Sequence, residues 1–261
     1  MIKFFRKIRQ QLLSENKFSK YLLYAIGEIV LVVIGILIAL QLNTWRIEKK
    51  DQQIEKTILE NIKRDLESDI QEFNNVKEFK ISQSEAALRL LEYLIDASKP
   101  LENTVQFVND MHLIIYFIVP SSNSTSFDIA TNTGYLNNIT NDSLINELSK
   151  YYNNIQLEQH VTETKRFINA YSDNYLMKNY PMFSNKVMPL DGQGGEYALE
   201  RYSNDNRPIL GPKDIRGDTS LENYLNMLSI RLKIGIKGLE EEEKWAHRII
   251  LKIENQLNLK N

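Results

Sequence analysis

Residues that could carry out catalysis or bind a metal are few and widely spaced in this sequence. It contains no cysteine, which excludes disulfides, thiolate zinc sites, iron–sulfur clusters and cysteine nucleophiles. His160 with Glu163, and Glu243 with His247, have helical spacing, so each pair could face one way on a helix. A metal site needs three or four converging ligands, and isolated pairs are more often ordinary surface contacts. We therefore predict no catalytic residue, no metal and no cofactor.

Three other patterns have an ordinary structural interpretation beside a functional one. The glycines of Gly192–Gly195 lack the Lys-Ser/Thr that follows in a phosphate-binding loop, which favours a flexible turn. Residues 216–218 spell the adhesion tripeptide Arg-Gly-Asp, for which chance is the better explanation. A group of tyrosines could line a ligand pocket, although such aromatics more often pack between helices: Tyr151, Tyr152, Tyr171, Tyr175 and Tyr180.

One ionisable residue lies where a charge is costly. Glu28 is the only charged residue in the apolar run from Tyr21 to Leu42, about 10 Å from its start if the run is helical. Gly35 and Ala39 fall within about 20° of Glu28 on a helical wheel, and small residues let a second helix approach closely. Glu28, Gly35 and Ala39 are therefore the candidate site. They form either a packing seam, with a protonated or snorkelling Glu28, or an ion-coupling site.

The run that contains Glu28 predicts a transmembrane helix over residues 21–42. Its 22 residues would span about 33 Å as a helix, which matches a hydrocarbon core of about 30 Å. A buried core helix is rarely this long and apolar. A cleaved signal peptide is disfavoured because the run is too long and no small-x-small cleavage pattern follows it.

The charges that flank the run predict its orientation. Six Lys/Arg residues precede it and four follow closely, so the N-terminus is expected in the cytoplasm and the rest of the chain on the far side. Tyr21, Tyr24 and Trp45 have the positions of interfacial aromatic anchors. Residues 1–20 combine basic side chains with apolar ones at helical spacing. They either lie on an anionic leaflet as an amphipathic helix or only enforce this topology.

The remaining residues, 43–261, predict an all-α domain. After residue 42 the chain has 26 Lys/Arg and 32 Asp/Glu, and this acidic balance argues against a nucleic-acid partner. Residues 45–97 contain neither Pro nor Gly and place apolar residues on one broad face, so we expect a bundle helix, continuous with the span. Leu88 and Ile95 belong to this predicted core face. Lys77 and Lys80 interrupt it, which predicts a break there.

Further elements of the bundle follow from caps and prolines. Within residues 105–119 we expect the apolar run Leu113–Val119, which Pro120 ends, to form a buried core helix or strand rather than a second span. We also expect a helix from Leu144 to about Tyr180 after an N-cap at 141–143. Residues 181–218 contain four of the six prolines and predict a long irregular excursion. Thr219 and Glu222 form a capping box for a last helix, which Glu242 and Glu243 would bend or turn outward.

Two stretches resemble a known family. The run FFRKIRQQLLSENKFSKYLLYAIGEIVLVVIGILIALQLNTW, from Phe4 to Trp45, closely resembles the N-terminal signature of a Bacteroidota membrane protein family defined only as a domain of unknown function. The run SFDIATNTGYLNNITNDSLINELSKYYNNI, from Ser126 to Ile155, looks like a further element of that family. The resemblance implies a Gram-negative inner-membrane protein with a periplasmic domain, and it brings no activity, cofactor or catalytic residue.

Together these patterns predict a membrane-anchored periplasmic binding, scaffolding or sensing protein. Its expected partners are the lipid bilayer, a second transmembrane helix or a second copy, and a protein of the envelope. The alternative is an accessory subunit of a complex driven by the proton-motive force, with Glu28 as its ion-coupling residue. That alternative rests on layout: a short cytoplasmic N-terminus, one span with an acid near its cytoplasmic end, and a periplasmic domain. A periplasmic hydrolase is a third candidate, weakened by the lack of an acid–base constellation.

Overall fold

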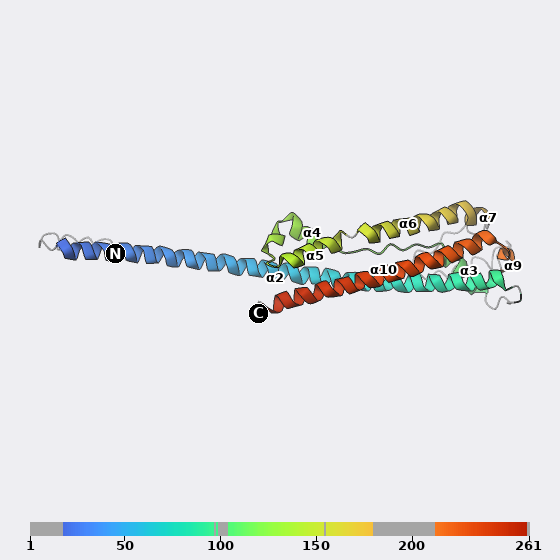
Figure 1. The fold of residues 1–261 in the computed structure, drawn as a ribbon, viewed down its shortest axis with the longest axis horizontal. Coiled ribbons are helices and arrows are strands. Elements are labelled where there is room, and N and C mark those ends of the chain that lie inside the picture. Colours follow the sequence, from blue (N-terminus) through green and yellow to red (C-terminus); the bar gives the residue numbers. More distant parts are fainter. Residues whose placement is uncertain (1–17, 97, 99–103, 154, 180–211, 260–261) are drawn as a thin grey trace, which may run out of the picture. The chain divides into compact units, whose positions relative to one another are not determined.

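A computed structural model describes residues 18–96, 98, 104–153, 155–179 and 212–259. All regular structure within these ranges is helical, which confirms the predicted all-α class (Figure 1). The chain divides into two compact units, residues 1–57 and 58–261. The amphipathic segment predicted for residues 1–20, and most of the excursion predicted for 181–218, lie outside the described ranges.

The first unit contains the start of α2, which extends from Phe18 to Ile95 as one α-helix. The helix therefore continues without interruption from the apolar run into the first bundle helix, as the lack of Pro and Gly after Gly35 predicts. Its side chains from residue 29 to residue 50 are exposed all round the helix. Within the described chain, α2 is the one helix long and apolar enough to cross a membrane.

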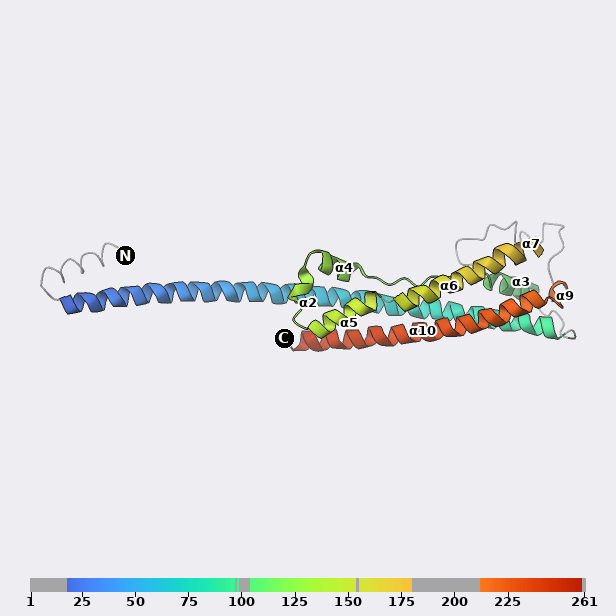
Figure 2. The same cartoon turned by 45° about the horizontal axis from the view of Figure 1, so that its top comes forward.

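The second unit is built on two long antiparallel helices. From Ile58 onward α2 lies beside α10 (Thr219–Asn258), and both views show the pair side by side (Figures 1 and 2). Shorter elements complete the unit and follow in chain order: α3 (Thr104–Leu113), α4 (Thr125–Asn132), the 3₁₀ turn η1 (Tyr135–Asn138), α5 (Asp142–Tyr152), α6 (Ile155–Tyr171), the π-helical turn η2 (Ser172–Leu176), α7 (Met177–Asn179) and α9 (Pro212–Ile215). In both views α5 and α6 lie on one side of the α2–α10 pair.

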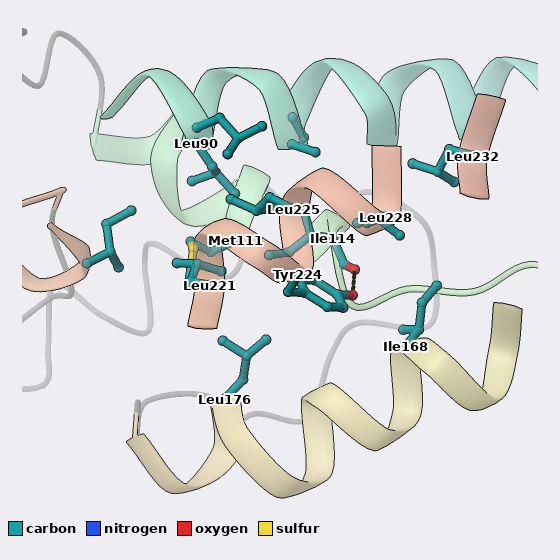
Figure 3. Packing of buried hydrophobic residues seen from close by; sticks show 14 of the residues in the cluster. Leu90, Met111, Ile114, Ile168, Leu176, Leu221, Tyr224, Leu225, Leu228 and Leu232 are labelled. Carbon is teal, nitrogen blue, oxygen red and sulfur yellow. Dashed lines mark hydrogen bonds between the residues drawn. The ribbon is translucent and has the colours of Figure 1, made fainter. Parts of the chain in front are cut away.

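The main apolar core forms where four helices meet. Leucines of α10 and α2 pack against Met111 of α3 and against Ile168 of α6, and all of these side chains are at least 90% buried (Figure 3). The predicted core face of α10 is confirmed by its buried residues: Leu221, Leu225, Leu228, Leu232, Leu239, Ala246, Ile250 and Ile253. A smaller cluster of Phe73, Val76 and Leu239 continues the packing along the pair.

The predicted break of α2 at Lys77 and Lys80 is wrong, and α10 does not end or break at Glu243. The Lys77 ammonium lies 2.8 Å from the Glu243 carboxylate, so the residues that interrupt the two apolar faces pair with each other. Lys63 and Glu254 form a second ion pair between the same helices, at 2.5 Å. Charges in an apolar stripe are thus compatible with continuous helices when the partner helix supplies the opposite charge at the same height.

The apolar run from Leu113 to Val119 is neither a helix nor a strand after α3 ends at Leu113, which corrects the prediction for this stretch. Side chains satisfy its backbone carbonyls instead. Gln83 Nε2 donates to the carbonyls of Leu113 and Tyr116, both at 2.8 Å. The Tyr224 hydroxyl donates to the carbonyl of Ile114 at 2.6 Å (Figure 3).

Two helix boundaries also differ from the predictions. The helix predicted from Leu144 to Tyr180 is interrupted after Tyr152, where Asn153 ends α5; Asn141 is its N-cap, as expected, and accepts from the backbone N–H of Leu144. The capping box at Thr219 is not formed. Asp218 is the N-cap of α10 and accepts from the backbone N–H groups of Ser220 and Leu221.

Candidate functional site

The predicted candidate site lies in the apolar part of α2. Gly35 has no atom within 4 Å of the position a Cβ would occupy, and the Ala39 side chain is exposed. Glu28 is half-buried and occurs on the same side of the helix. Within the described chain this face is therefore open to a second helix at Gly35 and Ala39, although nothing in the chain brings a ligand to it.

A different polar site is built in the second unit around a carboxylate that the sequence patterns did not single out. Asp69 of α2 is 1% exposed and accepts three hydrogen bonds. The donors are the Ser122 hydroxyl at 2.8 Å, the backbone N–H of Asn123 at 2.6 Å and the Tyr151 hydroxyl at 3.0 Å. We call Asp69 and these donors the Asp69 clamp. It fixes the polar loop before α4, and α5, to the surface of α2.

Asp65, one turn earlier on α2, extends this arrangement. Its carboxylate accepts from the Asn123 side chain at 3.1 Å and from the backbone N–H of Ser126 at 2.8 Å. The second bond satisfies an N–H in the first turn of α4, where a negative charge also complements the helix dipole. The Ser/Asn/Thr loop of residues 121–126 is thus ordered by two carboxylates spaced four residues apart.

The electrostatics of the Asp69 clamp reflect its burial. Burial raises the pKa of Asp69, while the hydrogen bonds from Asn123, Ser122 and Tyr151 act in the opposite direction. Burial, followed by the charge of Asp69, raises the pKa of Tyr151. Its hydroxyl therefore stays protonated and donates a hydrogen bond to the carboxylate. The clamp consequently has the chemistry of a structural hydrogen-bond network, in which three donors from two elements converge on one carboxylate.

A second buried carboxylate joins α3 to α2. Asp110 is 1% exposed, and its carboxylate accepts hydrogen bonds from Nε and Nη2 of Arg89, both at 2.8 Å, in a bidentate arrangement. The side chain of Gln106 donates to the same carboxylate at 2.8 Å. The hydrogen bond to Asp110 raises the pKa of Arg89. Asp110 therefore acts as an anchor for α3.

Lys80 is the most unusual cation of the bundle. It is 6% exposed, and its ammonium lies 5.5 Å from the centre of the Phe117 ring. Burial lowers the pKa of Lys80. The sequence pattern predicted a helix break at this residue. In the structure it lies within a continuous helix, against the extended segment that follows α3.

The tyrosines among the described residues take part in helix packing, and the last residue of the Arg-Gly-Asp tripeptide caps a helix. Tyr171 stacks on Tyr175 and on Tyr224, with ring centroids 5.1 and 3.8 Å apart, and Tyr151 contacts Trp245 edge-on at 5.6 Å. Tyr175 also donates its hydroxyl to Asp218 at 2.7 Å. Asp218 of the tripeptide is therefore occupied as a helix cap. Tyr180 and Gly192–Gly195 lie outside the described residues.

The histidine–carboxylate pairs do not assemble a metal site in the part of the chain that is described. No group of three or more His, Asp or Glu side chains there could hold a metal ion. The carboxylate of Glu243 is bonded to Lys77, and this hydrogen bond lowers the pKa of Glu243. The side chain of His160 is not among those described.

The helical bundle and the exposed apolar helix define the class: an all-α protein with one candidate membrane-spanning helix near its N-terminus. A family model described as "Family of unknown function (DUF6090)" matches residues 28–158, half of the chain. The protein belongs to this family. The matched region begins at Glu28, within the resemblance noted for residues 4–45, and includes Asp65, Asp69, Asp110 and Tyr151. No curated protein and no solved structure matches the chain.

Proposed function

We propose that this protein is a single-pass scaffolding or binding protein of the bacterial inner membrane, with a cytoplasmic N-terminus and a periplasmic helical bundle. The observation that carries the proposal is the exposure of the apolar run of α2, none of which is buried within the described chain. A helix that is apolar on all sides must be covered, and lipid covers it without leaving backbone groups unsatisfied. The resemblance to a Bacteroidota family supports the inner-membrane location.

The bundle supports a binding role more than a catalytic one. Asp69 and Asp110 are committed to hydrogen bonds between elements, and Asp218 is committed to a helix cap. Such a bundle offers its surface to partners and holds that surface in a fixed arrangement. In the proposed assembly the face of Glu28, Gly35 and Ala39 packs against a second transmembrane helix.

Reporter fusions test the topology. Alkaline phosphatase, which is active only in the periplasm, should be active when fused after Ala97 and inactive when fused after Lys20, because six basic residues hold the N-terminus in the cytoplasm. A fluorescent protein that folds only in the cytoplasm should give the complementary result. The reverse pattern of activities would refute the periplasmic location of the bundle.

Substitutions in the span test whether its face packs or couples ions. Gly35→Leu should reduce co-purification of two differently tagged copies, or of a span partner, about tenfold, since a bulky side chain separates helices that gain about 1–2 kcal/mol from close contact. Glu28→Gln should leave co-purification and growth unchanged, because the amide keeps the hydrogen-bonding capacity of a protonated acid. Loss of growth in Glu28→Gln with intact assembly would instead support ion coupling.

A further inference from the structure

One row of apolar side chains on α2 is exposed although the sequence pattern assigned two of its members to the core. Ile81, Leu88 and Ile95 are 42, 49 and 73% exposed. They recur at intervals of seven residues, about two helical turns, so they share one side of the helix. Lys77, which reaches α10, lies one turn before Ile81 on the same side. The row therefore runs along the edge of α2 that borders α10, on the side away from the core.

Charges of opposite sign flank this row. On α2, Glu85 is exposed and points outward beside the row, and its carboxylate is 3.9 Å from Arg89 of the same helix. On α10, Lys233 is exposed on the corresponding outward side, next to Ile230, which is 52% exposed. Lys237, also exposed, lies one turn after Lys233 on α10. We call Ile81, Glu85, Leu88 and Ile95 of α2 with Ile230 and Lys233 of α10 the outer face.

The register of the two helices places these residues in pairs at equal height. The ion pairs Lys63–Glu254 and Lys77–Glu243 set the antiparallel register of α2 and α10. When this register is continued toward the start of α10, Glu85 lies level with Lys233, and Leu88 lies level with Ile230. At this level the outer face thus carries a negative charge on α2, apolar side chains beside it and a positive charge on α10.

We propose that the outer face binds the outer face of a second copy about a twofold axis parallel to the helices. Rotation about this axis keeps every residue at its height and sets α2 of one copy against α10 of the other. Glu85 then meets Lys233 of the second copy, twice per dimer, with Leu88 and Ile230 at the same level beside this pair. The axis requires both copies to have one orientation, as two copies in one membrane do. In this respect the inference rests on the membrane anchoring proposed above.

The chemistry of the face favours a second copy over an unrelated protein. A face in which Glu85 and Lys233 lie level on neighbouring helices is self-complementary under this rotation, whereas one of these two charges would repel a uniformly acidic or basic partner. Four apolar side chains from each copy and two exposed ion pairs per dimer are a small interface, of the size found in transient complexes. Anchoring in a shared membrane raises the effective concentration of the copies, so a small interface is sufficient.

Thiol cross-linking tests the proposal with the full-length protein, because the natural chain contains no cysteine. Glu85→Cys in one epitope-tagged copy and Lys233→Cys in a differently tagged copy are co-expressed and treated in isolated membranes with a short bis-maleimide. We expect a mixed cross-linked dimer at least ten times more abundant than for Glu85→Cys with Lys244→Cys. Lys244 is also exposed on α10, but it lies eleven residues, about 16 Å, farther along the helix. Equal or absent cross-linking in the two combinations overturns the proposal.

Charge reversal supplies a second readout that span packing cannot produce. With Ile81→Cys and Lys237→Cys as reporters, Glu85→Lys in both copies should reduce the mixed dimer several-fold, and adding Lys233→Glu should restore it. Failure of the second change to restore the dimer overturns the proposed pairing. The treatment of isolated membranes does not depend on which side holds the bundle, so a reversed topology in the reporter fusions would leave this test intact.

Discussion

Replacement of Asp69 by alanine is expected to destabilise the bundle by about 3 kcal/mol. The change removes the acceptor of three hydrogen bonds at a site that is 1% exposed. The hydroxyls of Ser122 and Tyr151 can turn toward other acceptors, but the backbone N–H of Asn123 cannot, and each buried unsatisfied donor costs about 1–3 kcal/mol. Thermal unfolding of the full-length protein in detergent, followed by far-ultraviolet circular dichroism, should show a melting temperature lower by roughly 6–12 °C.

Matched variants separate the clamp from a general loss of packing. Tyr151→Phe removes one donor and should cost only about 1 kcal/mol. In a Trp45→Phe background Trp245 is the remaining tryptophan, and its contact with Tyr151 makes its fluorescence a local probe of the clamp. Asp69→Ala should shift that probe to lower temperature together with the helical signal. An unchanged melting temperature in Asp69→Ala would show that the clamp does not contribute to stability.

The raised pKa of Asp69 also predicts the direction in which the stability difference between the natural protein and Asp69→Ala changes with pH. Burial raises the folded-state pKa of Asp69 above its ordinary value of 3.8, so the folded protein holds this proton more tightly than the unfolded chain does. The proton-linked part of the Asp69 contribution to stability therefore increases as pH falls through the interval between the raised pKa and 3.8. This part is lost as pH rises through the raised pKa, whereas the three hydrogen bonds to the carboxylate remain. The difference between the natural protein and Asp69→Ala should change in this direction across that interval.

The second large effect is expected at the ion pair between α2 and α3. Arg89→Met leaves the buried carboxylate of Asp110 without its cation and should cost about 3–5 kcal/mol. Asp110→Leu should cost less, about 1–2 kcal/mol, because the Arg89 side chain is 38% exposed and water can solvate it after the loss of its partner. Urea unfolding of the full-length protein in detergent, followed by circular dichroism, measures both.

The double variant completes the cycle. Arg89→Met with Asp110→Leu should be more stable than Arg89→Met alone, since it no longer buries an uncompensated charge. The coupling energy should be about 2 kcal/mol or more. If the two single changes were equally costly and their effects simply additive, the bidentate pair would be energetically irrelevant and Asp110 would anchor α3 by packing alone.

The elements that the sequence predicted well are those in which one side chain pattern dominates. The core face of α10 is apolar on both sides of its interruption at Glu242 and Glu243, and its buried residues extend from Leu221 to Ile253. The N-cap of α5 was predicted within residues 141–143, where Asn141 is the cap, because an N-cap depends on residues within one turn. The apolar run of α2 was recognised as a candidate membrane span from its length and composition alone. These features are local, so a single sequence is sufficient for them.

The features that escaped prediction depend on residues distant in sequence. Lys77 was interpreted as a helix breaker because its partner, Glu243, is 166 residues away. In the sequence, Asp69 resembles the many acidic residues of the helix surface, because its partners Asn123 and Tyr151 are distant in the chain. Its position as a polar residue within an apolar stripe was the one signal that could have identified it. Leu88 and Ile95 were predicted to lie in the core and are exposed, because the apolar face of α2 is wider than the face that α10 and its neighbours cover.

The extended segment after α3 has a consequence for the order in which the chain folds. Its carbonyls and N–H groups are held by side chains 30 to 110 residues away, among them Gln83, Asp69 and Tyr224. The last of these belongs to α10, which follows the segment by about 100 residues in the sequence. During synthesis the bond from Tyr224 to Ile114 must wait until the first turns of α10 have emerged, and contacts of such long range form slowly. Closure of this segment therefore reports the docking of α10.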